Sequence, residues 1–157
     1  KGYGWTFEER LVVVAPQSHY DRVNLFGATS PYTGETIEMA SSNAKSESYV
    51  KYLNKIARAH PRKRVWLYQD NTRVHKSKKV EKFLEKHSNI QLRYMPKYSP
   101  ELNPREYWHG FLRKKLLNNN NYDSTRALIG AVHSFTRNTP KNIIRSVCTL
   151  KPIYNLA

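Results

Sequence analysis

Apolar and polar positions alternate along the first third of the chain, a pattern typical of β-strands. Leu11 and three β-branched valines fill positions 11–14, and alternation follows at 22–28 and again at 35–39. Residues 31–34 read Pro-Tyr-Thr-Gly, which is a turn sequence between the second and third of these segments. We therefore expect antiparallel strands joined in chain order.

Helical spacing of the apolar positions begins after residue 45. Tyr49, Leu53 and Ile56 lie three or four residues apart, and Pro61 ends the segment. The apolar run at 65–68 shows no alternation, which favours a strand covered on both faces in parallel pairing. A helix at 77–87 and a strand at 90–94 follow, so a strand–helix–strand crossover is expected.

Capping residues predict the remaining helices. Asn103 before Pro104 is a favourable N-cap, so a helix is expected from there to about residue 117. Ser124 opens another helix that runs to about residue 138, and Pro140 opens a short last one. This order of elements predicts one mixed α/β domain with a three-layer core.

The charge balance narrows the class of partner. The 157 residues include 27 Lys and Arg against 12 Asp and Glu, a net charge of +15, which favours nucleic acid over a lipid surface as the partner. We expect no small-molecule substrate. The longest apolar run, residues 11–15, is far shorter than the roughly 20 residues that span a bilayer, so no membrane helix is expected. Cys148 is the single cysteine, and we expect no signal peptide because the first residues do not show that pattern. We expect a cytoplasmic, nucleoid-associated protein.

Asp70 is the first candidate for chemistry. It ends the strand predicted at 65–68, and open α/β sheets bind ligands at such carboxyl ends. A carboxylate left unpaired there is costly, so it has to meet a cation, a metal or several donors. The alternative is that Asp70 caps the following turn through its side chain.

Glu106 is the second candidate, at the third position of the helix that Asn103 opens. It either reaches back as a capping partner of Asn103 or serves as a ligand, because helical geometry places it opposite the apolar stripe. Gly110, one turn later on the same side, either lets a ligand approach or is simply tolerated on an exposed face. If Asp70 and Glu106 converge in one pocket, their oxygens suit divalent cations that act on phosphates.

Two segments resemble a known family. Residues 68–77, YQDNTRVHKS, and residues 94–108, YMPKYSPELNPREYW, are similar to the catalytic core of DDE transposases of the mariner-like superfamily, in its prokaryotic insertion-sequence branch. The likeness rests on the Asp-Asn pair with His five residues after the Asp, on the Pro-x-Tyr-Ser-Pro-x-Leu-Asn-Pro-x-Glu string, and on 35 residues between Asp70 and Glu106. It extends more weakly upstream, so most of the chain is covered.

The resemblance implies an RNase H-like fold with a mixed sheet flanked by helices. It also implies two Mg²⁺ or Mn²⁺ ions, nicking at transposon ends, strand transfer to target DNA, and action as a homodimer on paired ends. In the family pattern Asp70 is the second acidic ligand and Glu106 the third, so both are candidate catalytic and metal-binding residues.

One departure from the family pattern concerns the first catalytic Asp. In the family this residue lies on a strand before the segment that resembles Gly4 and Trp5, so we expect that strand to be missing here. Asp21 follows polar residues and is a poor substitute. We expect residues 1–157 to be a single domain truncated at its N-terminus, without a helix-turn-helix domain and without appreciable cleavage activity alone. The open sheet would invite dimerisation or strand exchange.

Basic residues cluster after the second acid. Between Arg73 and Lys97 there are eight Lys or Arg against two Glu, which is either a solvated surface or a phosphate-binding one. The candidate DNA-binding residues are His75, Lys76, Lys78, Lys97, Arg105 and Arg113. His75 has the alternative role of stabilising a turn. Two other functions stay open, namely another RNase H-like nuclease and a non-catalytic DNA-binding or dimerising fragment.

Overall fold

The structure, a computed structural model, describes residues 23–96, 99, 102–117 and 120–149. The strands and α-helices of this part are β1 (Asn24–Thr29), β2 (Thr36–Ser41), α1 (Ser46–Ala59), β3 (Val65–Gln69), α2 (Lys78–Lys86), β4 (Ile90–Tyr94), α3 (Pro104–Leu112), α4 (Thr125–Asn138) and α5 (Lys141–Cys148). A 3₁₀ turn (Arg73–Lys76) precedes α2, and a π-helical segment (Arg113–Leu117) extends α3. These elements match the expected order, while the strand expected at 11–14 lies outside the described residues.

The strands form two pairs. β1 and β2 are an antiparallel hairpin in which Gly27 lies opposite Glu38. Its turn brings Gly34 to a φ of 70°, and a Cβ on Gly34 would lie 2.2 Å from the carbonyl oxygen of Lys141 at the start of α5. β3 and β4 are parallel and are connected through α2. No backbone ladder joins the two pairs within the described residues.

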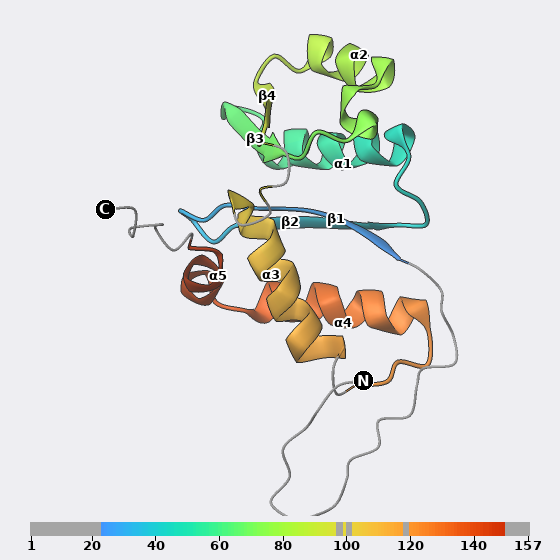
Figure 1. The fold of residues 1–157 in the computed structure, drawn as a ribbon, viewed down its shortest axis with the longest axis vertical. Helices are drawn as coiled ribbons and strands as arrows, with labels where there is room; N and C mark the ends of the chain where they lie inside the picture. Colours follow the sequence, from blue (N-terminus) through green and yellow to red (C-terminus); the bar gives the residue numbers. More distant parts are fainter. Residues whose placement is uncertain (1–22, 97–98, 100–101, 118–119, 150–157) are drawn as a thin grey trace, which may run out of the picture.

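Helix α1 packs on both strand pairs. Tyr52 donates to the carbonyl of Ile37 on β2 at 3.2 Å, and Tyr49 donates to the side chain of Gln69 on β3. The core on this side has the buried residues Tyr49, Tyr52, Leu53, Ile56, Val80, Phe83 and Ile90. Figure 1 shows α1 and α2 on one side of the β1–β2 hairpin.

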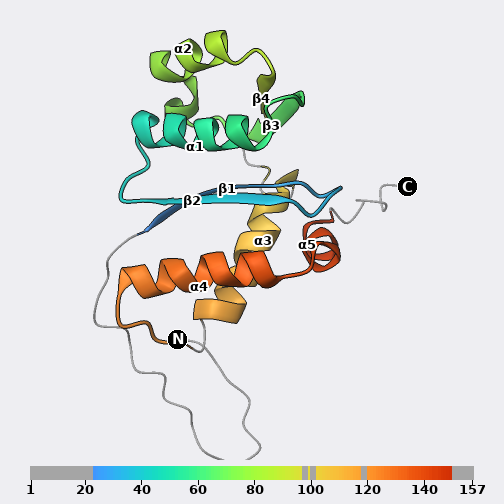
Figure 2. The same ribbon diagram turned by 180° about the vertical axis from the view of Figure 1, so that it is seen from behind.

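A second core lies on the other side of the hairpin, where Figures 1 and 2 show α3, α4 and α5. Its buried residues are Trp108, Leu112, Leu116, Ile144 and Cys148, and Leu25 of β1 packs against them. Helices therefore cover both faces of the hairpin, which confirms the expected three layers. None of the helices described combines the length and the apolar character needed to cross a bilayer.

The burial of β3 differs from the expectation. Trp66 and Tyr68 are 56% and 60% exposed, while Gln69 on the opposite face is buried. The prediction of a strand covered on both faces is therefore wrong for the part of the chain that the structure describes. The uninterrupted apolar run misled, because α1 and α2 cover one face of β3 and the other face carries large aromatic side chains.

Candidate functional site

Asp70 directly follows β3 and begins a tight turn. Its side chain is 62% exposed, and its Oδ1 lies 3.0 Å from Nδ1 of His75. The same oxygen accepts a hydrogen bond from the Thr72 amide at 3.4 Å. The turn-capping interpretation thus describes one carboxylate oxygen, whereas Oδ2 has no hydrogen-bond partner among the described residues.

The turn around Asp70 is fixed from both sides. The Met95 amide donates to the carbonyl of Gln69 at 2.9 Å, and the Asn71 side chain donates to the carbonyl of Met95 at 3.0 Å. His75 packs its ring 4.3 Å from that of Tyr49. Asp70 is therefore held in place between two residues that are bound to the strand end of β4, while its own carboxylate faces solvent.

Glu106 lies in the first turn of α3. As predicted, Asn103 is the N-cap, since its side chain accepts from the Arg105 amide at 3.0 Å with Pro104 at the first helical position. Glu106 is exposed, and its carboxylate accepts no hydrogen bond from the Asn103 amide in the described part of the chain. Glu106 is therefore not used as a capping partner there.

Asp70 and Glu106 belong to segments that are close along the chain. Met95 is bound beside Asp70, and α3 begins nine residues later and contacts β1. Figure 1 shows the first turn of α3 beside the β1–β2 hairpin. No direct contact between the two acids is described, so their convergence on one metal stays a prediction.

The carboxylates of Asp70 and Glu106 supply some of the ligands that a hard cation needs. Asp70 offers a free carboxylate oxygen and Glu106 an exposed carboxylate, which are the ligands that Mg²⁺ prefers. No group of three or more His, Cys, Asp or Glu able to hold a metal is found among the residues described. The two acids thus fit a site completed by substrate oxygens or by further polypeptide.

The candidate DNA-binding residues fall into separate places. Next to Asp70, Lys76 is exposed, with Nζ 4.7 Å from the centre of the Tyr94 ring, and Lys78 is exposed at the start of α2. The His75 side chain is 15% exposed and occupied by Asp70, so its turn-stabilising role is present. Arg113 is exposed at the far end of α3. Lys97 lies outside the described residues.

Arg105 points inward rather than toward solvent. Its side chain is 14% exposed, and Nη1 lies 2.8 Å from Oε1 of Glu38, which is itself buried on β2. This geometry does not favour a DNA contact through Arg105. Sequence reasoning missed Glu38; the available signal was an acid at an alternating position of a predicted strand, in a chain poor in acids.

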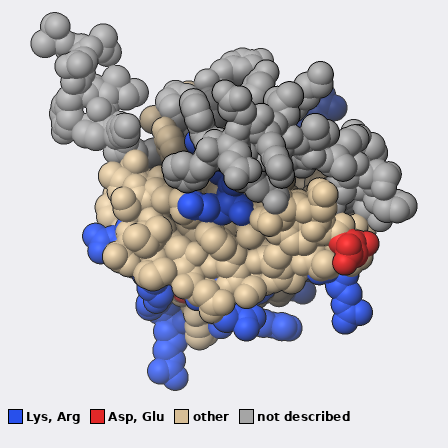
Figure 3. Space-filling view, turned by 90° about the horizontal axis from the view of Figure 1, so that it is seen from below, with Lys and Arg blue, Asp and Glu red and all other residues tan. Residues whose placement is uncertain are grey.

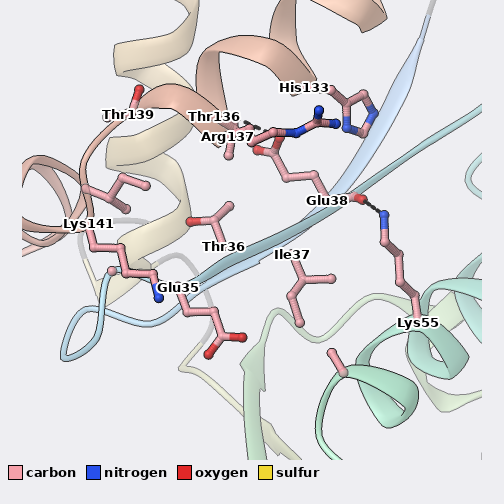
Figure 4. A pocket seen from close by; sticks show the side chains of 13 residues that line it. Glu35, Thr36, Ile37, Glu38, Lys55, His133, Thr136, Arg137, Thr139 and Lys141 are labelled. Atoms are coloured by element: carbon pink, nitrogen blue, oxygen red, sulfur yellow. Dashed lines mark hydrogen bonds between the residues drawn. The ribbon is translucent and has the colours of Figure 1, made fainter.

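A cavity of about 390 Å³ lies along β2, between α1, α4 and α5. Figure 4 shows Lys55, Arg137 and Lys141 around it, with Glu35 and Glu38. In Figure 3 most of the described surface on the side of α3, α4 and α5 belongs to uncharged residues, with Lys and Arg atoms both within it and along its edge and an acidic group at one end. Neither feature includes Asp70 or Glu106.

Comparisons with known structures identify the fold. The chain resembles the Mos1 transposase paired-end complex with left transposon end with a TM-score of 0.67 and 16% identity, covering 94% of this chain and 46% of that one. The crystal structure of the catalytic domain of Mos1 mariner transposase matches with a TM-score of 0.59 and 17% identity, covering 71% of this chain and 60% of that one. The Mos1 catalytic domain with raltegravir and Mg matches with a TM-score of 0.59 and 19% identity, covering 73% of this chain and 61% of that one.

The fold is thus the RNase H-like fold of the Mos1 catalytic domain, as the sequence predicted. The chain spans less than two thirds of the length of each of these proteins. No curated protein matches it. The family model described as DDE superfamily endonuclease matches residues 1–129, and the chain therefore belongs to the DDE superfamily endonucleases.

Proposed function

We propose that this chain is the catalytic core of a DNA transposase of the mariner-like superfamily. It nicks transposon ends and transfers the strands to target DNA, with Mg²⁺ or Mn²⁺ as cofactor. The observation that carries the proposal is the placement of Asp70 at the exposed carboxyl end of β3, with one oxygen free, in a chain of the DDE family. The Mos1 structures with transposon-end DNA and with Mg support it by likeness of fold.

Asp70 and Glu106 are the proposed metal ligands. They would hold divalent ions, which would supply stabilisation of the attacking and leaving oxygens of an in-line displacement at phosphorus. His75 orients Asp70, because its Nδ1 lies 3.0 Å from Oδ1 and 3.3 Å from the backbone carbonyl oxygen of Asp70, whereas Oδ2 has no hydrogen-bond partner among the described residues. A carboxylate held in this way loses little rotational freedom when a cation binds.

The described residues do not form a complete site. No third acid joins Asp70 or Glu106 among them, so a further carboxylate is needed for two ions. We propose that the described part does not cleave DNA without that ligand. DNA contacts are proposed for Lys76, Lys78, Lys97 and Arg113, and a homodimer on paired ends is the proposed assembly.

Mn²⁺ binding to the purified chain tests the two ligands, measured by electron paramagnetic resonance of the free ion. Asp70→Asn and Glu106→Gln are each expected to weaken Mn²⁺ binding at least tenfold without lowering the melting temperature, because both side chains are exposed. Glu85→Gln, which neutralises an exposed acid on α2, is the matched control. Equal binding by all four proteins would contradict the assignment.

Cleavage assays separate the proposed function from its alternatives. Mn²⁺-dependent nicking of end DNA by the purified chain, abolished by Asp70→Ala, would contradict the need for a further carboxylate. Cutting of any RNA–DNA hybrid regardless of terminal sequence would favour another RNase H-like nuclease. DNA binding with no metal binding would favour a non-catalytic fragment.

A further inference from the structure

A buried carboxylate lies beneath the turn that carries Glu106. Glu38 projects from β2 and is 5% exposed, although ionised side chains are rarely buried without partners. Its Oε1 lies 2.8 Å from Nη1 of Arg105 and accepts from Nε1 of Trp108 at 3.2 Å. Its Oε2 accepts from the hydroxyl of Thr136 on α4 at 3.0 Å, as Figure 4 shows.

Two of these donors flank Glu106 on α3. Arg105 and Trp108 are three residues apart and therefore share one face of the helix, and both end on the same oxygen of Glu38. Because Arg105 and Trp108 both contact Oε1 of Glu38, together they hold the start of α3 against β2 and limit the rotation of the helix about its axis. Glu106, between them in sequence, is on the exposed side of that turn.

The path of Arg105 to Glu38 depends on Gly27. Gly27 is the cross-strand neighbour of Glu38, and a Cβ built on it would lie 2.2 Å from Cζ of Arg105 and 2.3 Å from Nη2. No side chain fits there while the guanidinium occupies its place. Nη2 is buried without a hydrogen-bond partner in the described part, and Nη1 has only a long bond of 3.5 Å to Thr29 besides Glu38. Glu38 is therefore the group that holds the guanidinium.

We propose that Glu38 and Gly27 are positioning residues for Glu106: Glu38 anchors the first turn of α3 through Arg105 and Trp108, and Gly27 keeps open the slot for Arg105. The inference rests on the proposed function in taking Glu106 as a metal ligand. It concerns residues of β1 and β2 that contact neither metal nor DNA in the proposed function. Residues that orient metal ligands typically change affinity 10–100-fold when altered.

The test combines two variants with two controls. Glu38→Gln removes the charge that holds Arg105, and Gly27→Ala fills the slot without touching a carboxylate. The controls are Glu35→Gln, the same change on the same hairpin, and Gly130→Ala in α4, where an added Cβ meets no heavy atom within 4 Å. Mn²⁺ affinity is measured well below each melting temperature, so that loss of folding does not enter.

We expect Mn²⁺ affinity to fall at least tenfold in Glu38→Gln and Gly27→Ala and to stay unchanged in both controls. Amide hydrogen exchange is expected to rise at residues 104–108 while that of α4 and α5 stays as in the unaltered protein. Unchanged affinity in folded Glu38→Gln would overturn the proposal, and so would an even rise of exchange across α3, α4 and α5, which is the sign of a merely structural role.

The experiments distinguish failure of the proposed function from failure of this further inference. If Glu106→Gln leaves Mn²⁺ binding of the otherwise unaltered protein unchanged, the ligand assignment fails, and the exchange data alone decide whether Glu38 and Gly27 position the turn. If Glu38→Gln does not fold, Gly27→Ala carries the same measurement.

Discussion

A carboxylate can cap a turn and still bind a ligand when its two oxygens have different partners. In Asp70, Oδ1 accepts a hydrogen bond from the Thr72 amide and lies 3.0 Å from Nδ1 of His75, while Oδ2 has no hydrogen-bond partner in the described part. The structural and the functional interpretations of this residue therefore do not exclude each other. In Arg105 they do, because Glu38 occupies the group that would bind a phosphate.

Buried ionisable groups make the protein sensitive to alkaline pH. Burial raises the pKa of the Cys148 thiol to about 11, and burial also raises the pKa values of the Tyr49 and Tyr52 hydroxyls. These groups ionise in the unfolded chain before they do in the folded one, so their stabilising effect is complete below the unfolded pKa values and falls as pH rises. We expect the urea concentration at the midpoint of unfolding to change little with pH near pH 7.5 and to fall from about pH 9 to pH 11. A midpoint that rises over this range would contradict the burial of these groups.

At the scale of the element, local sequence rules predicted most of the helices and strands. The N-caps at Asn103 and Ser124 accept the expected backbone amides, because these bonds depend on residues two or three positions away. Apolar spacing placed α1 and α2 for the same reason. Cys148, the single cysteine, is buried.

Long-range features escaped the sequence. The pair of Glu38 and Arg105 joins residues of β2 and α3, and no local pattern indicates which distant cation a strand acid meets. The open face of β3 was missed because an apolar run does not tell which elements cover it. The site was predicted as far as the position of each acid in its element, whereas Met95 binding beside Asp70 was not foreseen.

Helix α1 couples the two strand pairs. Leu53, with 0% exposure, lies at the centre of the core that includes residues of both pairs. Leu53→Ala is expected to cost about 2–5 kcal/mol and to destabilise both pairs together, because the cavity opens beneath both. Urea unfolding followed by circular dichroism gives the free energy, and hydrogen exchange reports each pair. Lys51→Ala, on the exposed side of α1, is the control, and loss of protection in one pair alone would contradict the coupling.

At the scale of the whole molecule, the net charge is +15, and exposed basic side chains lie on more than one side of the described chain. Lys76 and Lys78 are exposed next to Asp70, and Arg126, Arg137 and Arg145 are exposed on α4 and α5. Basic side chains near the candidate site would hold a polyanion that two acids alone would repel.

The salt dependence of DNA binding tests this arrangement. Replacing Lys76 and Lys78 by Gln is expected to weaken binding and to reduce the slope of log K against log salt by about 2, one for each phosphate that is no longer neutralised. The matched control replaces Lys82 and Lys86, exposed residues farther along α2. The same change of slope in both double variants would mean that the whole basic surface binds DNA without preference for this region.

The arrangement of the strands in two separate pairs is relevant to whether the protein forms dimers. β1 pairs with β2 and β3 with β4, and within the described chain neither β1 nor β3 has a second strand partner. A strand edge that stays unpaired favours pairing with another chain. We expect concentration-dependent dimers in sedimentation velocity, and a stable monomer with one cooperative melt would count against association through these edges.

The contact of Gly34 with α5 has a practical consequence for labelling. Hairpin tips are usually safe places for an epitope, a fluorophore or an inserted loop. Here the tip lies directly on the backbone of Lys141, more than a hundred positions later in the sequence, and its left-handed backbone suits glycine. An insertion at this tip would push α5 away from the hairpin, so probes for this protein belong elsewhere, such as on the exposed residues of α2.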